Sequence, residues 1–214
     1  MARSAAKPRS TIVLFVRHGQ TPTTGTLLPG RAAGLHLSDA GQAQARAVAE
    51  RLAALPSVDA IYASPLERTR ETARPIGEAR GLKVRVDRGL LEADIGDWTG
   101  QELKTVRKAP EWKTVQAYPS GFRFPGGESF VEMQNRILAT VERLRAAHPG
   151  GTVVAVSHAD VIKAAVAHAL GTHLDLFQRI VISPCSVTAV SYGDTGPIVL
   201  SVNSVGDLKT VKPS

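Results

Sequence analysis

Short apolar runs rich in β-branched residues alternate along this chain with longer segments that carry apolar residues at helical spacing. The runs are TIVLFV at 11–16, VDAIYAS at 58–64, LKVRVD at 82–87 and GTVVAVS at 151–157. A continuous apolar run of this length is typical of a strand covered on both faces, as strands of a parallel sheet are. The alternation therefore predicts an α/β fold, a three-layer sandwich with a mostly parallel central sheet and helices on both faces.

The segments between these runs have recognisable helix starts and ends. Ser38 has the side chain of an N-cap for the first helix, and Pro56 follows its end. Pro65 is expected in the first turn of the second helix, where proline is tolerated, and Gly81 stops that helix. On this basis the expected helices cover residues 38–55, 65–80, 128–148 and 160–170.

The rest of the chain is less regular. Residues 88–127 contain three prolines and several glycines, and we expect one or two short helices there. Residues 185–192 and 197–204 have the composition of a closing pair of strands, with GDTG at 193–196 as their turn.

Length and composition indicate one soluble domain. A chain of 214 residues suffices for one large domain, which we expect over residues 11–205, with flexible tails at 1–10 and 206–214. The one cysteine, Cys185, is expected to be packed in a strand, and it cannot form an intrachain disulfide. No stretch approaches the ~20 apolar residues of a membrane span. We therefore expect a cytoplasmic protein with no membrane partner.

The net charge of +7 raises the question of a nucleic-acid partner. Four of these seven charges lie in the first and last ten residues, which leaves a modest excess on the body of the chain. Basic residues form no run and are not interleaved with aromatic residues. We therefore expect no nucleic-acid partner, and the sequence leaves the oligomeric state open.

Charged and polar residues follow the apolar runs at the points where the strands should end. In doubly wound sheets, ligands bind beyond the carboxyl ends of the strands. We therefore expect the side chains that follow the four runs to form one site. They are Arg17 and His18 after the first run, Arg68 after the second, Glu92 after the third and His158 after the fourth.

These residue types fit chemistry at phosphorus. Guanidinium groups are forked donors that match phosphate oxygens, and Arg17 and Arg68 can hold them together with His158. Two positive neighbours disfavour a protonated imidazole, so His18 keeps a lone pair with which to attack phosphorus and become phosphohistidine.

A departing alkoxide also needs a proton. Glu92 can supply it and then accept one from the attacking water, provided that burial or a nearby anion raises its pKa. Asp94 and Asp97 are the alternatives for this role. The chain lacks HExxH, CxxC, a run of aspartates and a P-loop signature, and we expect neither a metal ion nor a cofactor.

Taken together, these motifs resemble those of the histidine phosphatase superfamily, in its phosphoglycerate-mutase-like branch. The resemblance runs in order over about residues 11–203. The motifs that carry it are VRHGQT at 16–21, LSDAGQAQA at 37–45, SPLERTRETA at 64–73, LLEADIGDWTG at 90–100, PGGESF at 125–130 and VSHADVIKAAV at 156–166.

This resemblance implies a metal-independent phosphohistidine enzyme with a three-layer α/β fold. His18 would be the nucleophile and Glu92 the proton donor, and Arg17, Arg68 and His158 would form the phosphate pocket.

The chain also departs from the family pattern. Thr24 stands where the family often has an asparagine, and its hydroxyl can still donate to phosphate. GRAAGLHLS at 30–38 replaces the usual GRxDxPLS, and Ala159 replaces a glycine. With residues 174–187, these features are similar to an actinobacterial subgroup of probable phosphomutases. Arg31 contacts phosphate or substrate, or is an exposed loop arginine.

Three functions are compatible with these motifs. The first is a phosphatase that hydrolyses a small organic phosphomonoester. The chain lacks the long insertion of glycolytic mutases, and this favours the phosphatase. The alternative is a phosphomutase that uses the same intermediate. A third, less favoured because nucleophile and acid are both present, is a non-catalytic module that binds a phosphorylated ligand.

Several residues also have a purely structural interpretation. Arg68 could form an ion pair with Glu67 or Glu71 on a helix surface. His158 could simply begin a helix. Trp98 is expected to be a packed anchor rather than a substrate platform, whereas Lys163 could contact substrate from the first turn of its helix.

Overall fold

The structure, a computed structural model, describes residues 10–206. Its centre is the parallel pair of β1 (Thr11–Arg17) and β4 (Thr152–Ser157), built from the two most apolar runs. In their register Ile12 lies beside Thr152 and Arg17 beside Ser157. Both strands therefore end together, which brings the residues that follow them to the same point. Residues 1–9 and 207–214, where we expect flexible tails, lie outside the described part.

The other strands complete a six-stranded sheet in the order β3-β2-β4-β1-β5-β6. β2 (Ala60–Ala63) and β3 (Val84–Val86) are parallel to β4 and β1. β5 (Val187–Gly193) and β6 (Gly196–Ser204) are antiparallel and close the other edge. The prediction of a mostly parallel sheet with a closing strand pair is confirmed.

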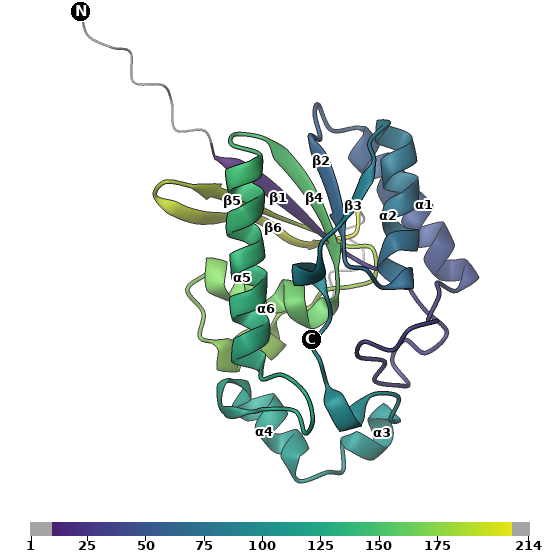
Figure 1. Ribbon diagram of the computed structural model, residues 1–214, viewed down its shortest axis with the longest axis vertical. Coiled ribbons are helices and arrows are strands. Elements are labelled where there is room, and N and C mark those ends of the chain that lie inside the picture. The colour runs from purple at the N-terminus through teal and green to yellow at the C-terminus, as the bar shows by residue number, and fades with distance from the viewer. Residues whose placement is uncertain (1–9, 207–214) are drawn as a thin grey trace, which may run out of the picture.

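Helices cover both faces of this sheet (Figure 1). α1 (Asp39–Ala53) and α2 (Glu67–Arg80) lie on one face, and α5 (Phe130–Ala147) and α6 (Ala159–Ala169) lie on the other. The short helices α3 (Leu103–Val106) and α4 (Glu111–Ala117) lie beyond the carboxyl ends of the strands (Figure 1). Short 3₁₀ helices occupy Arg88–Leu90, Gly96–Trp98, Pro119–Gly121 and Leu174–Arg179.

The core has two halves, one on each side of the sheet. Val13 and Phe15 pack with α5 and α6, whereas Leu14 and Val16 pack with α1 and α2. Successive side chains of a strand point to opposite faces, so a strand buried on both faces needs an uninterrupted apolar run. This is the physical reason for the TIVLFV pattern.

The prediction for Pro65 is wrong. α2 begins at Glu67 with Leu66 at its N-cap, so Pro65 precedes the helix. Ser64 still donates its backbone N–H to Val156 of β4, over 3.0 Å. The chain therefore leaves the sheet only after Ser64 and needs two further residues to turn into the helix.

Gly41 packs the start of α1 directly against the loop that follows β1. A Cβ atom on Gly41 would lie 2.0 Å from the carbonyl oxygen of Gln20. We therefore expect Gly41→Ala to lower the free energy of unfolding by about 1–3 kcal/mol, as overpacked cores do. Urea denaturation measures this change, and the exposed neighbour variant Gln42→Ala is the control. Unchanged stability of Gly41→Ala would contradict the close approach.

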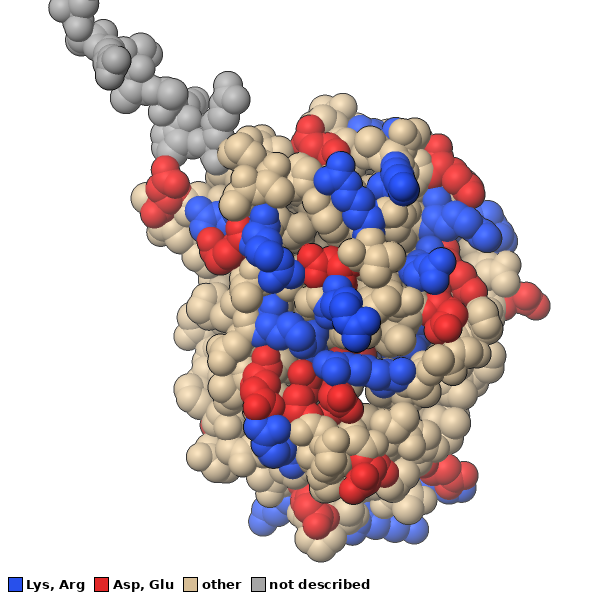
Figure 2. Space-filling view, viewed as in Figure 1, with Lys and Arg blue, Asp and Glu red and all other residues tan. Residues whose placement is uncertain are grey.

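The described surface mixes both signs of charge. On the face shown in Figure 2, Lys and Arg side chains lie interspersed with Asp and Glu side chains. Ion pairs on the described surface include Arg143 with Asp87 at 3.0 Å and Arg145 with Glu142 at 3.0 Å. In residues 10–206 no helix is both long and apolar enough to cross a membrane.

Candidate active site

The loop after β1 is held in place by backbone hydrogen bonds from three directions. His18 donates its N–H to Ser157 of β4 over 3.0 Å, and Gly19 donates its N–H to the Thr72 hydroxyl of α2 over 3.0 Å. Cys185 donates its N–H to the carbonyl of Arg17 over 3.0 Å. The position of His18 is thus fixed by β4, α2 and the segment before β5.

One hydrogen bond decides the tautomer of His18. Its Nδ1 lies 2.7 Å from the carbonyl oxygen of Gly19, and a carbonyl can only accept. Nδ1 therefore carries the proton and Nε2 carries the lone pair. Burial, together with the charges of Arg68 and Arg17, lowers the pKa of His18 to about 3. His18 is a neutral imidazole at physiological pH.

The guanidinium groups of the buried Arg68 and the half-buried Arg17 flank this imidazole with unused donors. Arg68 is fully buried and donates from Nη2 to the Gly30 carbonyl over 2.8 Å. Arg17 donates from Nη1 to the Ile182 carbonyl over 2.7 Å. Nε of both arginines and Nη1 of Arg68 have no partner among the described residues. Buried donors without a partner are costly, so their presence indicates a site for an anion.

His158 follows β4, and its side chain is fully buried. Its ring meets that of His18 edge to face, with centroids 5.2 Å apart. Nδ1 lies 3.4 Å from Nη2 of Arg68, and Nε2 lies 2.9 Å from the hydroxyl of Ser64. Burial, followed by the charge of Arg68, lowers the pKa of His158 well below its usual value, so this ring is also neutral.

Glu92 completes the group from the segment after β3. Its Oε2 lies 3.9 Å from Nδ1 of His158, and its Oε1 accepts the N–H of Ala93 over 2.9 Å. Burial, together with the nearby carboxylate of Asp160, raises the pKa of Glu92 to about 7. A carboxyl group with this pKa can both give and take a proton near neutral pH.

The two alternatives to Glu92 lie differently. Asp94 is bound to Arg31 through Oδ2 at 3.2 Å, and Asp97 is exposed. Of the three carboxyl groups, Glu92 is the one beside His158.

The structure thus brings Arg17, His18, Arg68, Glu92 and His158 together at the carboxyl edge of the sheet. Residues 13–205 match the family model of the histidine phosphatase superfamily, branch 1. The chain belongs to the histidine phosphatase superfamily.

Its relatives in this superfamily include both phosphatases and mutases. The chain is 32% identical to phosphoserine phosphatase 1 of Hydrogenobacter thermophilus over 196 residues, 89% of this chain and 91% of the relative. It is 31% identical to a probable phosphoglycerate mutase of Cronobacter sakazakii over 183 residues, 84% of each chain.

A solved structure of a superfamily member has the same fold. The mycobacterial glucosyl-3-phosphoglycerate phosphatase superposes with a TM-score of 0.82 at 29% identity, covering 92% of this chain and all of the other. Structures of that phosphatase also exist with VO3 and with inorganic phosphate. As a histidine phosphatase superfamily member, this chain is an enzyme of the phosphatase and mutase class.

Two predicted ligand contacts of this histidine phosphatase stay predictions. Arg31 is half-buried and bonds to protein oxygens through Nε, Nη1 and Nη2. The Thr24 hydroxyl accepts the N–H of Thr21 over 2.8 Å and so closes a local turn. Both side chains are half-buried rather than exposed. Arg68 does not pair with Glu67 or Glu71, because its guanidinium points into the site.

Three further side chains have defined surroundings. Trp98 packs between Trp112 and two phenylalanines, which confirms its interpretation as an anchor. Lys163 binds Asp160 Oδ1 at 3.0 Å and Gln178 Oε1 at 3.1 Å. Cys185 is buried, but it lies in the turn before β5 rather than in the strand, with φ of 53°.

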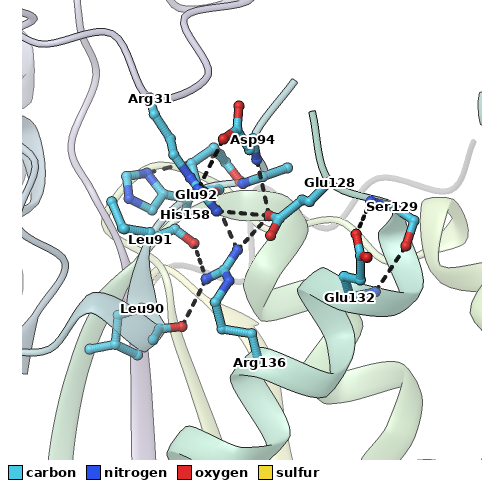
Figure 3. A network of polar contacts seen from close by, with 12 residues as sticks. Arg31, Leu90, Leu91, Glu92, Asp94, Glu128, Ser129, Glu132, Arg136 and His158 are labelled. Atoms are coloured by element: carbon cyan, nitrogen blue, oxygen red, sulfur yellow. Dashed lines mark hydrogen bonds and ion pairs between the residues drawn. The ribbon is translucent and has the colours of Figure 1, made fainter. Parts of the chain in front are cut away.

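Sequence reasoning missed three polar residues around the site: Ser64, Glu128 and Arg136. Figure 3 shows Glu128 and Arg136 together with Arg31 around the backbone of the Glu92 segment. One signal was available for Arg136, since it lies three residues after Met133 and next to Ile137, on the edge of the buried face of α5. An arginine beside a buried stripe needs acceptors, and the helix itself offers none.

Proposed function

We propose that this enzyme is a metal-independent phosphatase that hydrolyses a small organic phosphomonoester through a phosphohistidine intermediate. The observation that carries the proposal is the state of His18. Its proton is held on Nδ1 by the Gly19 carbonyl, so the Nε2 lone pair is free. Unpartnered guanidinium donors of Arg17 and Arg68 lie around the same ring.

In the first step, the lone pair of His18 Nε2 forms a bond to phosphorus while the bond between phosphorus and the ester oxygen breaks. The leaving oxygen takes the proton of the Glu92 carboxylic acid and departs as the alcohol. Arg17, Arg68 and His158 hold the equatorial oxygens of the phosphoryl group in flight. Because these donors are already oriented, the transition-state charge is stabilised without reorganisation, and the scheme needs no metal ion.

In the second step, the Glu92 carboxylate takes a proton from a water molecule. The water oxygen bonds to phosphorus while the bond between phosphorus and Nε2 breaks. This step releases inorganic phosphate and restores the protonated Glu92 and the neutral His18. The raised pKa of Glu92, to about 7, suits a group that must act once as acid and once as base.

The relatives guide the choice of substrate. Phosphoserine and glucosyl-3-phosphoglycerate are the esters that two of the compared phosphatases act on according to their names. Both are small organic phosphomonoesters, and they are the first candidates for this enzyme.

Phosphate release from 4-nitrophenyl phosphate in the presence of EDTA tests the proposal. We expect turnover by the purified protein without added metal, and inhibition by vanadate. A panel that includes phosphoserine and 3-phosphoglycerate then identifies the preferred ester. No phosphate release from any ester would overturn the proposed hydrolase.

A phosphomutase is the second candidate, and the similarity to a probable phosphoglycerate mutase favours it. The first step would be the same, but the phosphohistidine would return its group to a reoriented substrate instead of to water. Incubation of 3-phosphoglycerate with a bisphosphate primer distinguishes the two functions. Formation of the isomer at a higher rate than phosphate would establish the mutase.

Ser64 is expected to support the proposed role of His158. Its hydroxyl is 2.9 Å from Nε2 and bonds to it, which fixes the orientation of the His158 ring with Nδ1 toward the site. We expect Ser64→Ala to lower kcat about tenfold, because an orienting hydrogen bond contributes about 1–1.5 kcal/mol. Steady-state assays measure this, with Ser201→Ala in the exposed part of β6 as the control. An unchanged kcat for Ser64→Ala would contradict the role.

A further inference from the structure

One oxygen of Glu128 gathers three donors next to the segment that carries Glu92 (Figure 3). Its Oε1 accepts from Arg31 Nη2 over 3.0 Å, from Arg136 Nη2 over 2.6 Å and from the Asp94 N–H over 3.0 Å. The backbone N–H of Glu128 donates to the Asp94 carbonyl over 2.9 Å. The side chain of Glu128 is 15% exposed, so these charge-assisted bonds are shielded from water.

The two arginines in turn hold the backbone on both sides of Glu92. Arg136 donates to the carbonyls of Gly89 at 2.9 Å and Leu91 at 2.7 Å. The carbonyl of Glu92 itself accepts from Arg31 Nε at 2.8 Å and from Arg136 Nη2 at 3.2 Å. Both guanidinium groups thus bind the same peptide group, and Glu128 is the anion between them.

The same loop also connects this cluster with the anion-binding arginine. Arg68 donates to the carbonyl of Gly30, and the next residue, Arg31, donates to the carbonyl of Glu92. The position of the Glu92 backbone relative to Arg68 therefore depends on Arg31. Without Glu128, Asp94 would still pair with Arg31, but no carboxylate of the described residues would remain on Arg136 and none would lie between the two guanidinium groups.

We propose that Glu128 is a positioning residue for Glu92: through Arg31 and Arg136 it fixes the backbone from which the Glu92 carboxyl group reaches the leaving oxygen. This inference rests on the proposed function. In this inference Arg31 supports the backbone of the proton donor Glu92 and does not contact the phosphate. A misplacement of about 1 Å at a reacting group can lower the rate about 10²-fold. Rigid support of the Glu92 backbone therefore affects the rate of proton transfer.

The test compares two substrates that need the acid to different degrees. A nitrophenolate leaves readily without a proton, whereas a phenolate is a poorer leaving group and depends more on proton donation. For Glu128→Gln we expect kcat with phenyl phosphate to fall about tenfold and kcat with 4-nitrophenyl phosphate to fall less than about threefold. Glu92→Gln should show the same pattern with a larger loss.

A double-mutant cycle shows whether Glu128 acts through Glu92. In the Glu92→Gln background, Glu128→Gln should lower kcat with phenyl phosphate by less than about twofold, because coupled residues are not additive. Glu132→Gln is the matched control. Glu132 caps the same helix and pairs with Arg123, but it does not contact the Glu92 segment. This variant should leave the ratio of the two substrates unchanged.

Three results would overturn the proposal. Equal losses with both esters, or multiplicative losses in the double variant, would show a general structural role. A raised KM and weaker vanadate inhibition at constant kcat would instead place Arg31 on the phosphate. Failure of the wild-type enzyme on both esters is a different result, because it removes the proposed hydrolase itself and this proposal with it.

Discussion

Replacing His18 by alanine is expected to lower kcat by at least about 10⁴-fold, which is the scale of losing a nucleophile. The physical reason is that no other imidazole nitrogen beside the guanidinium pair is free among the described residues. His158 contacts Ser64 through Nε2 and Arg68 through Nδ1, so neither of its nitrogens is available to attack phosphorus. Phosphate release from 4-nitrophenyl phosphate measures the loss.

The same variant should still bind an anion. Arg17 and Arg68 keep their unpartnered donors, so His18→Ala is expected to bind vanadate or phosphate although it cannot turn over. Acid-quenched wild-type enzyme should carry acid-labile phosphate on His18, which a non-catalytic binding module would not. His168→Ala, an exposed histidine on α6, is the control for histidine content. Full activity in His18→Ala would refute the mechanism.

Replacing Glu92 by glutamine is expected to change both the rate and its pH dependence. Glutamine cannot give a proton, so kcat with phenyl phosphate should fall by about 10²- to 10⁴-fold at pH 6. In the wild-type enzyme the acid form of Glu92 is lost as pH rises through its pKa of about 7. Above this pH we expect kcat/KM to fall tenfold per pH unit, and the variant should lack this fall.

Two controls isolate this effect. The phosphate ester titrates with a pKa of about 6, but this ionisation is common to both enzymes and cancels in their ratio. His18 has a pKa of about 3, so the nucleophile stays neutral over the whole range and adds no change between pH 5 and 9. A variant that keeps the wild-type fall above pH 7 would exclude Glu92 as the proton donor, with Asp160 the next carboxyl group to test.

The sequence determined the sheet and the set of residues at its carboxyl edge. Short continuous apolar runs rich in β-branched residues favour strands buried on both faces, and parallel strands end on the same side. Arg17 and Ser157 are therefore register partners, and His18 and His158 follow side by side. Which residues follow each strand depends on where the apolar runs end, and the spacing of residues along the chain shows this directly.

The tertiary structure decided what each of these residues is bonded to. The tautomer of His18 depends on where the Gly19 carbonyl turns, and the burial of Arg68 depends on how α2 leaves the sheet. Arg31 and Glu128 are 97 residues apart in the chain and meet only because α5 packs beside the Glu92 segment. Hydrogen bonds are short-ranged and directional, so such partners are set by packing and leave no periodic signal in the sequence.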